Sequence, residues 1–144
     1  MIHILFLCVA NSARSQMAEG LARSVFGANA QVWSAGSHPG ALHPLATQAM
    51  KEIGLDISCQ FSKSTADIPQ EFIKKLQYVI TLCDEEICPM FSSQAIKLHW
   101  PIKDPASSHG SEEEKLDRFR QARDLIKKHL IALHTEIGSM TTTV

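Results

Sequence analysis

The chain opens with a short, nearly continuous apolar run, Ile2–Leu7. A run of this length without polar alternation is typical of a strand buried on both faces, as in a parallel sheet. After Ser15 the period changes, because apolar residues recur at every fourth position, at Met17, Leu21 and Val25. Two residues that commonly end a helix follow, Gly27 and Asn29. The pattern therefore predicts a strand, a loop and then a helix.

The alternation of strand and helix continues through the middle of the chain. Pro44 at the start of a helical pattern and Gly54 just after it predict a helix from Pro44 to Ile53. Three further apolar runs predict strands at Gln31–Ala35, Tyr78–Leu82 and Ile96–Trp100. The region between residues 56 and 70 is less regular, and no element is predicted there.

The C-terminal part predicts one long helix. Ser111 and Glu114 have the spacing of a capping box, in which each side chain accepts a hydrogen bond from the other residue's backbone N–H. Apolar residues then recur at intervals of three and four as far as Ile137, and residues 138–144 are expected to fray. Alternating strands and helices without a repeat or linker predict a single α/β domain, residues 1–137, built on a parallel sheet.

Composition narrows the class of protein. The chain has 144 residues, 44% of them hydrophobic and 20% charged, and a formal net charge of -1. One domain with a substantial core is expected, without the basic excess that binds nucleic acid. The first apolar run lacks the length of a membrane span and the basic start of a signal peptide. We therefore expect a cytoplasmic monomer that binds neither nucleic acid nor membranes.

The segment after the first strand has the features of an anion site. Cys8 would lie at the carboxyl end of that strand, where ligands bind in open α/β sheets. The following loop leads into a helix whose first N–H groups can converge on an oxyanion, and Arg14 adds a cation that can hold two oxygens at once. The predicted anion-binding residues are Val9, Ala10, Asn11, Ser12, Ala13, Arg14 and Ser15.

The same surroundings point to a nucleophile. A cysteine at a helix N-terminus beside a cation is favoured as the thiolate, so Cys8 is predicted to attack the bound tetrahedral anion. Ser15 is expected to donate a hydrogen bond to the Cys8 sulfur, and Asn11 is expected to hold the loop through its side-chain amide.

The stretch "LCVANSARSQMAEG" resembles the C-x5-R-S signature of the low-molecular-weight protein tyrosine phosphatase superfamily, and more closely its arsenate reductase branch. Further similar segments run along the chain, from "SAG" at 34–36 through "VITLCD" at 79–84 to "HWPIKDPA" at 99–106. The resemblance implies a three-layer α/β sandwich, in which helices flank a four-stranded parallel sheet and residues 8–15 form a phosphate-binding loop.

The resemblance also implies a thiol relay. Cys8 would attack arsenate, Cys83 would attack Cys8 as arsenite leaves, and Cys88 would then attack Cys83. The resulting disulfide would be reduced by an external thioredoxin-like protein or, as in a related subgroup, by glutathione with a glutaredoxin-like protein. The residues do not distinguish between these two reductants, and the resemblance implies no bound cofactor.

Other uses of these cysteines remain open. In a cytoplasmic protein all four cysteines are expected to be reduced, and Cys83 and Cys88 can also be unreactive thiols that merely pack. A zinc site would need the histidine pair His129 and His134 as well. The two pairs are too far apart for a zinc finger and the histidines face different sides of a helix, so no metal is predicted. Cys59 has no chemical context and is expected to be inert.

Asp104, in the segment "KDPA", matches the aspartate of the family that acts as general acid and would protonate the leaving oxygen. The alternative is an Asp-Pro turn without a chemical role. The phosphatases follow this Asp-Pro with an aromatic residue, whereas Ala106 follows it here, which favours a small inorganic anion, arsenate or phosphate.

Three functions follow from these patterns. The leading prediction is reduction of arsenate to arsenite, with five catalytic residues: Cys8, Arg14, Asp104, Cys83 and Cys88. The alternatives are a protein tyrosine phosphatase that hydrolyses phosphomonoesters, and a non-enzymatic module that binds oxyanions or senses oxidants.

Overall fold

The computed structural model describes residues 1–84, 94–106 and 109–141 of the chain. The strands in this part are β1 (Ile2–Cys8), β2 (Ala30–Gly36), β3 (Tyr78–Cys83) and β4 (Ile96–Ile102). The helices are α1 (Arg14–Phe26), α2 (Pro44–Lys51), α3 (Gln70–Lys74) and α4 (Glu112–Thr141). Two short 3-10 helices, η1 (Gly27–Asn29) and η2 (Thr65–Asp67), complete the described elements. The four predicted strands are all present, each extended by one or two residues.

The strands form one parallel sheet in the order β2-β1-β3-β4. β1 lies in the interior of the sheet, which explains its apolar sequence, because both of its faces are covered. Cys8 pairs with Gly36 of β2, and Leu7 pairs with Thr81 of β3. The carboxyl ends of these three strands therefore meet at one edge of the sheet.

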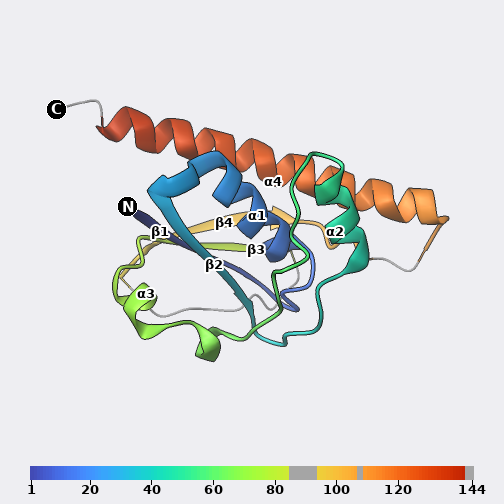
Figure 1. Cartoon of the computed structure of the whole chain (residues 1–144), viewed down its shortest axis with the longest axis horizontal. Helices are drawn as coiled ribbons and strands as arrows, with labels where there is room; N and C mark the ends of the chain where they lie inside the picture. The colour runs from blue at the N-terminus through green and yellow to red at the C-terminus, as the bar shows by residue number, and fades with distance from the viewer. Residues whose placement is uncertain (85–93, 107–108, 142–144) are drawn as a thin grey trace.

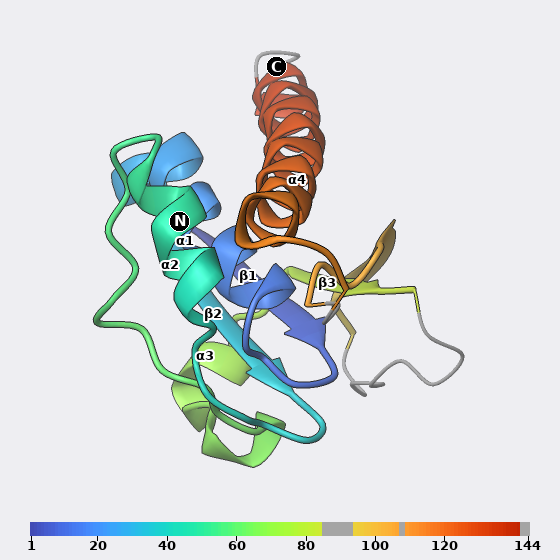
Figure 2. The same cartoon turned by 90° about the vertical axis from the view of Figure 1, so that its right-hand side faces the viewer.

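Helices cover both faces of the sheet, as Figure 1 and, from the side, Figure 2 show. On one face α1, α2 and α4 enclose the larger core, which contains Phe6 of β1. On the other face α3 packs through Phe72 against Leu5 and Leu7 of the same strand. Successive side chains of β1 enter opposite cores because strand side chains alternate in direction. The predicted three-layer α/β sandwich is confirmed.

The long C-terminal helix begins as its sequence indicates. The Glu114 N–H donates to Ser111 Oγ at 3.2 Å, and the Ser111 N–H donates to Glu114 Oε1 at 3.2 Å, so the predicted capping box is formed. The helix continues to Thr141, through Gly138 and into the segment expected to fray. One glycine costs only about 1 kcal/mol relative to alanine in a helix, which does not end so long an element.

Two smaller differences concern the middle of the chain. α2 ends at Lys51, two residues before the predicted Ile53. α3 was not predicted, because five residues are too few to show a helical period. No helix in the described part of the chain combines the length and the apolar composition needed to cross a membrane.

Candidate active site

Cys8 and Arg14 flank a short loop at the carboxyl edge of the sheet. β1 ends at Cys8 and α1 begins at Arg14, so residues 9–13 join strand to helix as predicted. Both side chains are buried, Cys8 being 2% and Arg14 5% exposed. Ala13 precedes the helix and has no side-chain oxygen to cap it, so the first turn of α1 presents its N–H groups to the loop.

The Cys8 sulfur lies against two hydrogen-bond donors, one from the loop and one from the first turn of α1. The Asn11 N–H donates to Cys8 Sγ at 3.2 Å, and Ser15 Oγ lies 2.9 Å from the same sulfur. Because Ser15 Oγ accepts a hydrogen bond from Asn11 Nδ2 at 2.6 Å, its own proton can point to Sγ. Hydrogen bonds to the charged form favour a thiolate. The geometry therefore suits a nucleophile, and Cys8 is a free thiol.

Asn11 has a left-handed backbone conformation with a φ of 48°, which asparagine tolerates better than most residues. Its side-chain oxygen accepts a hydrogen bond from the Lys63 N–H at 3.0 Å, so the amide nitrogen Nδ2 faces Ser15 and Ser34. Its backbone oxygen accepts from Ser62 Oγ at 2.6 Å. Asn11 thus holds the loop through its amide, as its sequence position indicates.

Three carbonyl groups of the loop are held by backbone hydrogen bonds. A neighbouring segment donates its backbone N–H groups to them, at 2.8 to 2.9 Å, in three bonds: His38 to Val9, Gly40 to Ala10 and His43 to Ser12. The N–H and C=O groups of a peptide unit point in opposite directions. Fixing the carbonyls on one side therefore turns loop N–H groups to the other side, where an oxyanion would bind.

Gly36 allows β2 to approach this loop. A Cβ atom at Gly36 would lie 2.5 Å from the Val9 carbonyl oxygen and 2.9 Å from the Asn11 nitrogen, both closer than packed atoms can be. The "SAG" segment that resembles the family thus has a direct steric reason for ending in glycine.

An open cavity of about 750 Å³ lies in front of the loop. Three of the predicted catalytic residues, Cys8, Arg14 and Asp104, line it together. The other lining residues are Val9, Ala10, Ser12, Ala13, Ser37, His38 and Ala106. The tertiary structure thus brings the nucleophile, cation and candidate acid predicted from three parts of the chain to one cavity.

Arg14 is anchored by the ends of two other strands. Its Nη1 donates to the Ile102 carbonyl oxygen at the end of β4, at 3.0 Å, and lies 3.5 Å from Asp84 Oδ1. Asp84 directly follows Cys83, and its side chain is 40% exposed. Asp84 was not predicted to be part of the site. An acidic residue directly after a strand-end cysteine was the signal that could have revealed it.

The position of Asp104 is compatible with both predicted roles, an Asp-Pro turn and a general acid. Its Oδ1 accepts a hydrogen bond from the Ala106 N–H at 3.0 Å, so it does shape a turn. The exposed carboxyl group also lines the cavity that contains Cys8. Its role as a general acid stays a prediction.

The second predicted redox cysteine, Cys83, lies at the same edge of the sheet as Cys8. It ends β3, the strand next to β1, and is fully buried. It is disulfide-bonded, so the expectation that all four cysteines are reduced is wrong for Cys83. Cys8 and Cys59 are free thiols. Cys88 lies outside the described residues. Cys59 is exposed and lines a separate pocket, away from Cys8.

The two histidines of the zinc alternative pack separately. His129 stacks on Trp100 with the ring centres 4.9 Å apart, whereas His134 packs edge-on against Phe26 at 5.1 Å. Within residues 1–84, 94–106 and 109–141 no group of three or more His, Cys, Asp or Glu side chains is arranged to hold a metal ion.

Buried charged residues behind the loop were not predicted. Glu19 on α1 is 3% exposed and Lys63 is 4% exposed, and their charged groups lie 3.6 Å apart. Glu19 lies within the helical pattern around Met17 and Leu21, where a single acidic residue does not indicate burial. Lys63 lies in the irregular region between residues 56 and 70. Local sequence therefore contained no signal for their pairing.

Comparison with known proteins places this geometry in a family. A family model described as low molecular weight phosphotyrosine protein phosphatase matches residues 3–142. The chain is 44% identical over 129 residues to an arsenate reductase from Halalkalibacterium halodurans, a match that covers 88% of this chain and 91% of the relative.

Solved structures agree with the sequence comparison. An arsenate reductase in a phosphate-binding state superimposes with a TM-score of 0.78 at 32% identity, covering 95% of this chain and 99% of the other. A thioredoxin-dependent arsenate reductase from Corynebacterium glutamicum superimposes with a TM-score of 0.62 at 29% identity, covering 90% of this chain and 62% of the other.

Proposed function

This chain belongs to the low molecular weight phosphotyrosine protein phosphatase family, and we propose that it is an arsenate reductase that works through Cys8 and a thiol relay. The observation that carries the proposal is the convergence of Cys8, Arg14 and Asp104 on one cavity. The names of its relatives and structural neighbours support the choice of arsenate as substrate.

Arsenate binds in front of the loop in this proposal. The N–H groups of residues 9–15 and the Arg14 guanidinium hold its oxygens, as helix N-termini and arginine forks hold other tetrahedral anions. A phosphate-binding state in a structural neighbour supports oxyanion binding at this kind of loop. Ala106 lies at the cavity wall and leaves the opening free of an aromatic ring there.

The first chemical step forms a sulfur–arsenic bond. An electron pair of the Cys8 thiolate attacks arsenic, and the arsenic–oxygen bond of one arsenate hydroxyl group breaks; with one proton from Asp104 this hydroxyl group leaves as water. Arsenic remains pentavalent in this adduct. The hydrogen bonds from Asn11 and Ser15 to Sγ support the thiolate before attack.

The second part transfers two electrons. The Cys83 thiolate attacks Cys8 Sγ and the sulfur–arsenic bond breaks with its electron pair on arsenic, which leaves as trivalent arsenite. The Cys88 thiolate then attacks Cys83, releasing the Cys8 thiolate and leaving a Cys83–Cys88 disulfide. Two electrons from a thioredoxin-like dithiol, or from glutathione with a glutaredoxin-like protein, restore both thiols. In the structure Cys83 is disulfide-bonded and Cys8 is free, which is the state of these two residues that the last step of the proposed relay would leave.

The test is arsenite production by the purified protein. Thioredoxin with its reductase is supplied in one assay, and glutathione with glutaredoxin in another. Turnover that disappears in Cys8→Ser and persists in Cys59→Ser supports the proposal, provided both variants unfold at the wild-type temperature. Loss of thioredoxin-coupled turnover in Cys83→Ser supports the relay.

Two outcomes would contradict the proposal. Arsenite production by Cys8→Ser would rule out Cys8 as the nucleophile. No turnover with either reductant, together with Cys8-dependent hydrolysis of a phosphotyrosine analogue that survives Cys83→Ser, would assign the protein to the phosphatases instead.

A further inference from the structure

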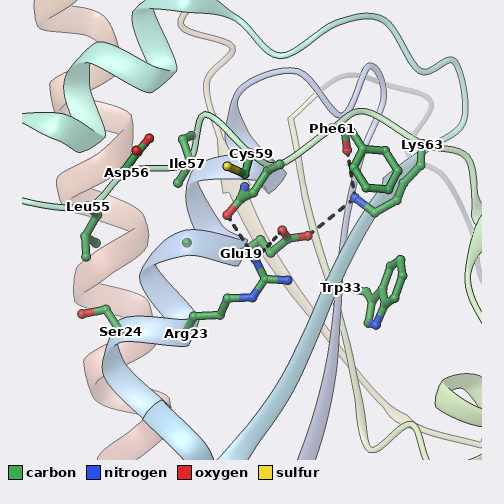
Figure 3. A pocket seen from close by; sticks show the side chains of 12 residues that line it. Glu19, Arg23, Ser24, Trp33, Leu55, Asp56, Ile57, Cys59, Phe61 and Lys63 are labelled. Atoms are coloured by element: carbon green, nitrogen blue, oxygen red, sulfur yellow. Dashed lines mark hydrogen bonds and ion pairs between the residues drawn. The ribbon is translucent and has the colours of Figure 1, made fainter.

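A buried ion pair lies next to the anion loop but does not line the cavity. Glu19 comes from α1 and Lys63 from the segment between α2 and α3, and Figure 3 shows the two side chains converging beside Trp33 and Phe61. Removing two charges from water is costly, and a buried pair is therefore weak evidence for added stability. The pair calls for another explanation.

Both charges are held in place by several contacts. The Lys63 ammonium donates to the Phe61 carbonyl oxygen at 3.0 Å and lies 4.8 Å from the centre of the Phe61 ring. The second carboxylate oxygen of Glu19 lies 2.9 Å from Arg23 Nη1. Burial lowers the pKa of Lys63, and the opposing charge of Glu19 limits that effect. The two side chains thus form a fixed arrangement.

Glu19 connects to the loop through one buried hydroxyl group. Ser34 Oγ donates to Glu19 Oε1 at 2.8 Å and accepts from Asn11 Nδ2 at 3.0 Å. The same Nδ2 also donates to Ser15 Oγ, which lies against Cys8 Sγ. Asn11, Ser15 and Ser34 are all fully buried, so water does not compete for these bonds.

Lys63 holds the other end of the same amide. Its backbone N–H donates to Asn11 Oδ1 at 3.0 Å, and its backbone oxygen accepts from the Gly36 N–H at 2.9 Å. The ion pair joins the Lys63 side chain to Glu19, and Glu19 reaches Asn11 through Ser34. The Asn11 amide is therefore held at both its nitrogen and its oxygen by one closed ring of contacts.

We propose that the Glu19–Lys63 ion pair positions the Cys8 thiolate. By holding the Asn11 amide from both ends, the pair keeps Asn11 in its left-handed conformation, so that the Asn11 N–H and the Ser15 hydroxyl both point at Sγ. Glu19 and Lys63 are positioning residues, since neither is among the described residues that line the anion cavity. The inference rests on the proposed function only in taking Cys8 as the nucleophile.

Direct electrostatics predicts a different result from positioning. If the charges acted on Cys8 only through space, neutralising Glu19 would make the thiolate easier to form and neutralising Lys63 would make it harder. If the pair acts by holding Asn11, either change loosens the two donors and makes the thiolate harder to form. The direction of the two effects therefore separates the mechanisms.

The experiment follows alkylation of Cys8 by iodoacetamide as a function of pH. Mass spectrometry of the Cys8 peptide in the fully reduced protein separates this thiol from the other three. We expect Glu19→Gln, Lys63→Met and Ser34→Ala each to raise the pH midpoint of alkylation by about 1 unit, which means about tenfold less thiolate below the midpoint. Arsenite turnover should fall in parallel.

A matched control is available on another face of the molecule. Arg123 of α4 is 8% exposed and its Nη1 lies 3.0 Å from Glu52 Oε1, so Arg123→Met also removes a buried cation from an ion pair. We expect this variant to lose stability, measured by urea unfolding, without a change in the Cys8 midpoint.

Several results would overturn the inference. A midpoint lowered by Glu19→Gln and raised by Lys63→Met would show action through space. Reduced stability with unchanged midpoints would show a purely structural pair. If the two charge variants do not fold, Ser34→Ala decides, because it keeps both charges and removes only the hydroxyl group that connects Glu19 to Asn11. An unchanged alkylation midpoint in Ser34→Ala contradicts the proposal. Alkylation needs no arsenate, so these results are independent of whether arsenate is the substrate.

Discussion

Asp84 Oδ1 lies 3.5 Å from Arg14 Nη1, so the cation at the start of α1 is paired with the residue that follows Cys83. The same Arg14 nitrogen donates to the Ile102 carbonyl oxygen at the end of β4. The ends of β3 and β4 thus converge on one guanidinium that belongs to the helix after β1. Because Arg14 is the proposed anion ligand, the Asp84 carboxylate competes with an incoming oxyanion for the same charge.

Replacing Asp84 by asparagine should therefore tighten anion binding. An ion pair with this exposure is worth about 0.2–1 kcal/mol, so the Kd for phosphate should fall by up to about fivefold in titration calorimetry. Asp117→Asn removes the same charge from an exposed position on α4 and serves as the control. Equal affinities in wild type and Asp84→Asn would show that the carboxylate does not compete.

Gly36→Ala should disrupt the anion loop. The added Cβ would lie 2.5 Å from the Val9 oxygen, so β2 or the loop must move. We expect arsenite turnover to fall at least about tenfold, since small displacements of positioned groups have large effects on rate. Gly40→Ala is the control, because no atom lies within 4 Å of its Cβ position and its backbone bond to Ala10 is retained. Similar losses in both variants would contradict the steric explanation.

Asp104→Asn separates the two roles of this residue. The asparagine oxygen can still accept the Ala106 N–H and keep the turn, whereas its amide cannot supply the proton for the leaving oxygen. General acid catalysis typically contributes about 10²–10⁴-fold, so kcat for arsenite formation should fall by at least about 10²-fold in a folded protein. Activity close to wild type would show that Asp104 shapes the turn and does not act as a general acid.

His43 should make stability dependent on pH. Its Nδ1 accepts the Leu45 N–H at 3.1 Å and so caps α2, which requires the unprotonated nitrogen. Burial lowers the pKa of His43 from 6.5, an effect that the nearby charge of Asp104 partly opposes. Below pH 6.5 the unfolded chain therefore binds more protons at His43 than the folded protein does. The contribution to stability is complete above this pH and is lost as the pH falls toward the lower folded value.

The test is the urea midpoint of unfolding between about pH 7 and pH 5. Asparagine also caps helices but does not titrate, so His43→Asn should show a smaller loss of stability on acidification than wild type. Part of the slope should remain, because burial also lowers the pKa of His129. His38→Asn, at an exposed position, should keep the wild-type slope. An unchanged slope in His43→Asn would show that the cap does not depend on this proton.

Local sequence was sufficient to predict the sheet, the long helix and the strand–loop–helix unit around Cys8. An apolar run, a change of period and a capping box are each encoded within a few neighbouring residues, because strand and helix periodicities are local properties. Cys8 at the end of β1 and Arg14 at the start of α1 follow directly from those boundaries. The apolar pattern also placed Cys83 at the end of a strand, whereas the proposed roles of Cys83 and Asp104 came from the family resemblance.

Only the tertiary structure decided what surrounds Cys8, the proposed nucleophile. Ser34 and Lys63 reach Asn11 across 23 and 52 residues of chain, and Asp84 reaches Arg14 from the end of another strand. These contacts depend on the strand order β2-β1-β3-β4 and on the close approach of β2 to the loop that Gly36 permits. A local sequence pattern specifies neither the strand order nor this approach, because the pairing of distant strands is set by the packing of the whole sheet between its helices. The sequence by itself determined which residue is the candidate nucleophile, and the fold determined which residues surround it.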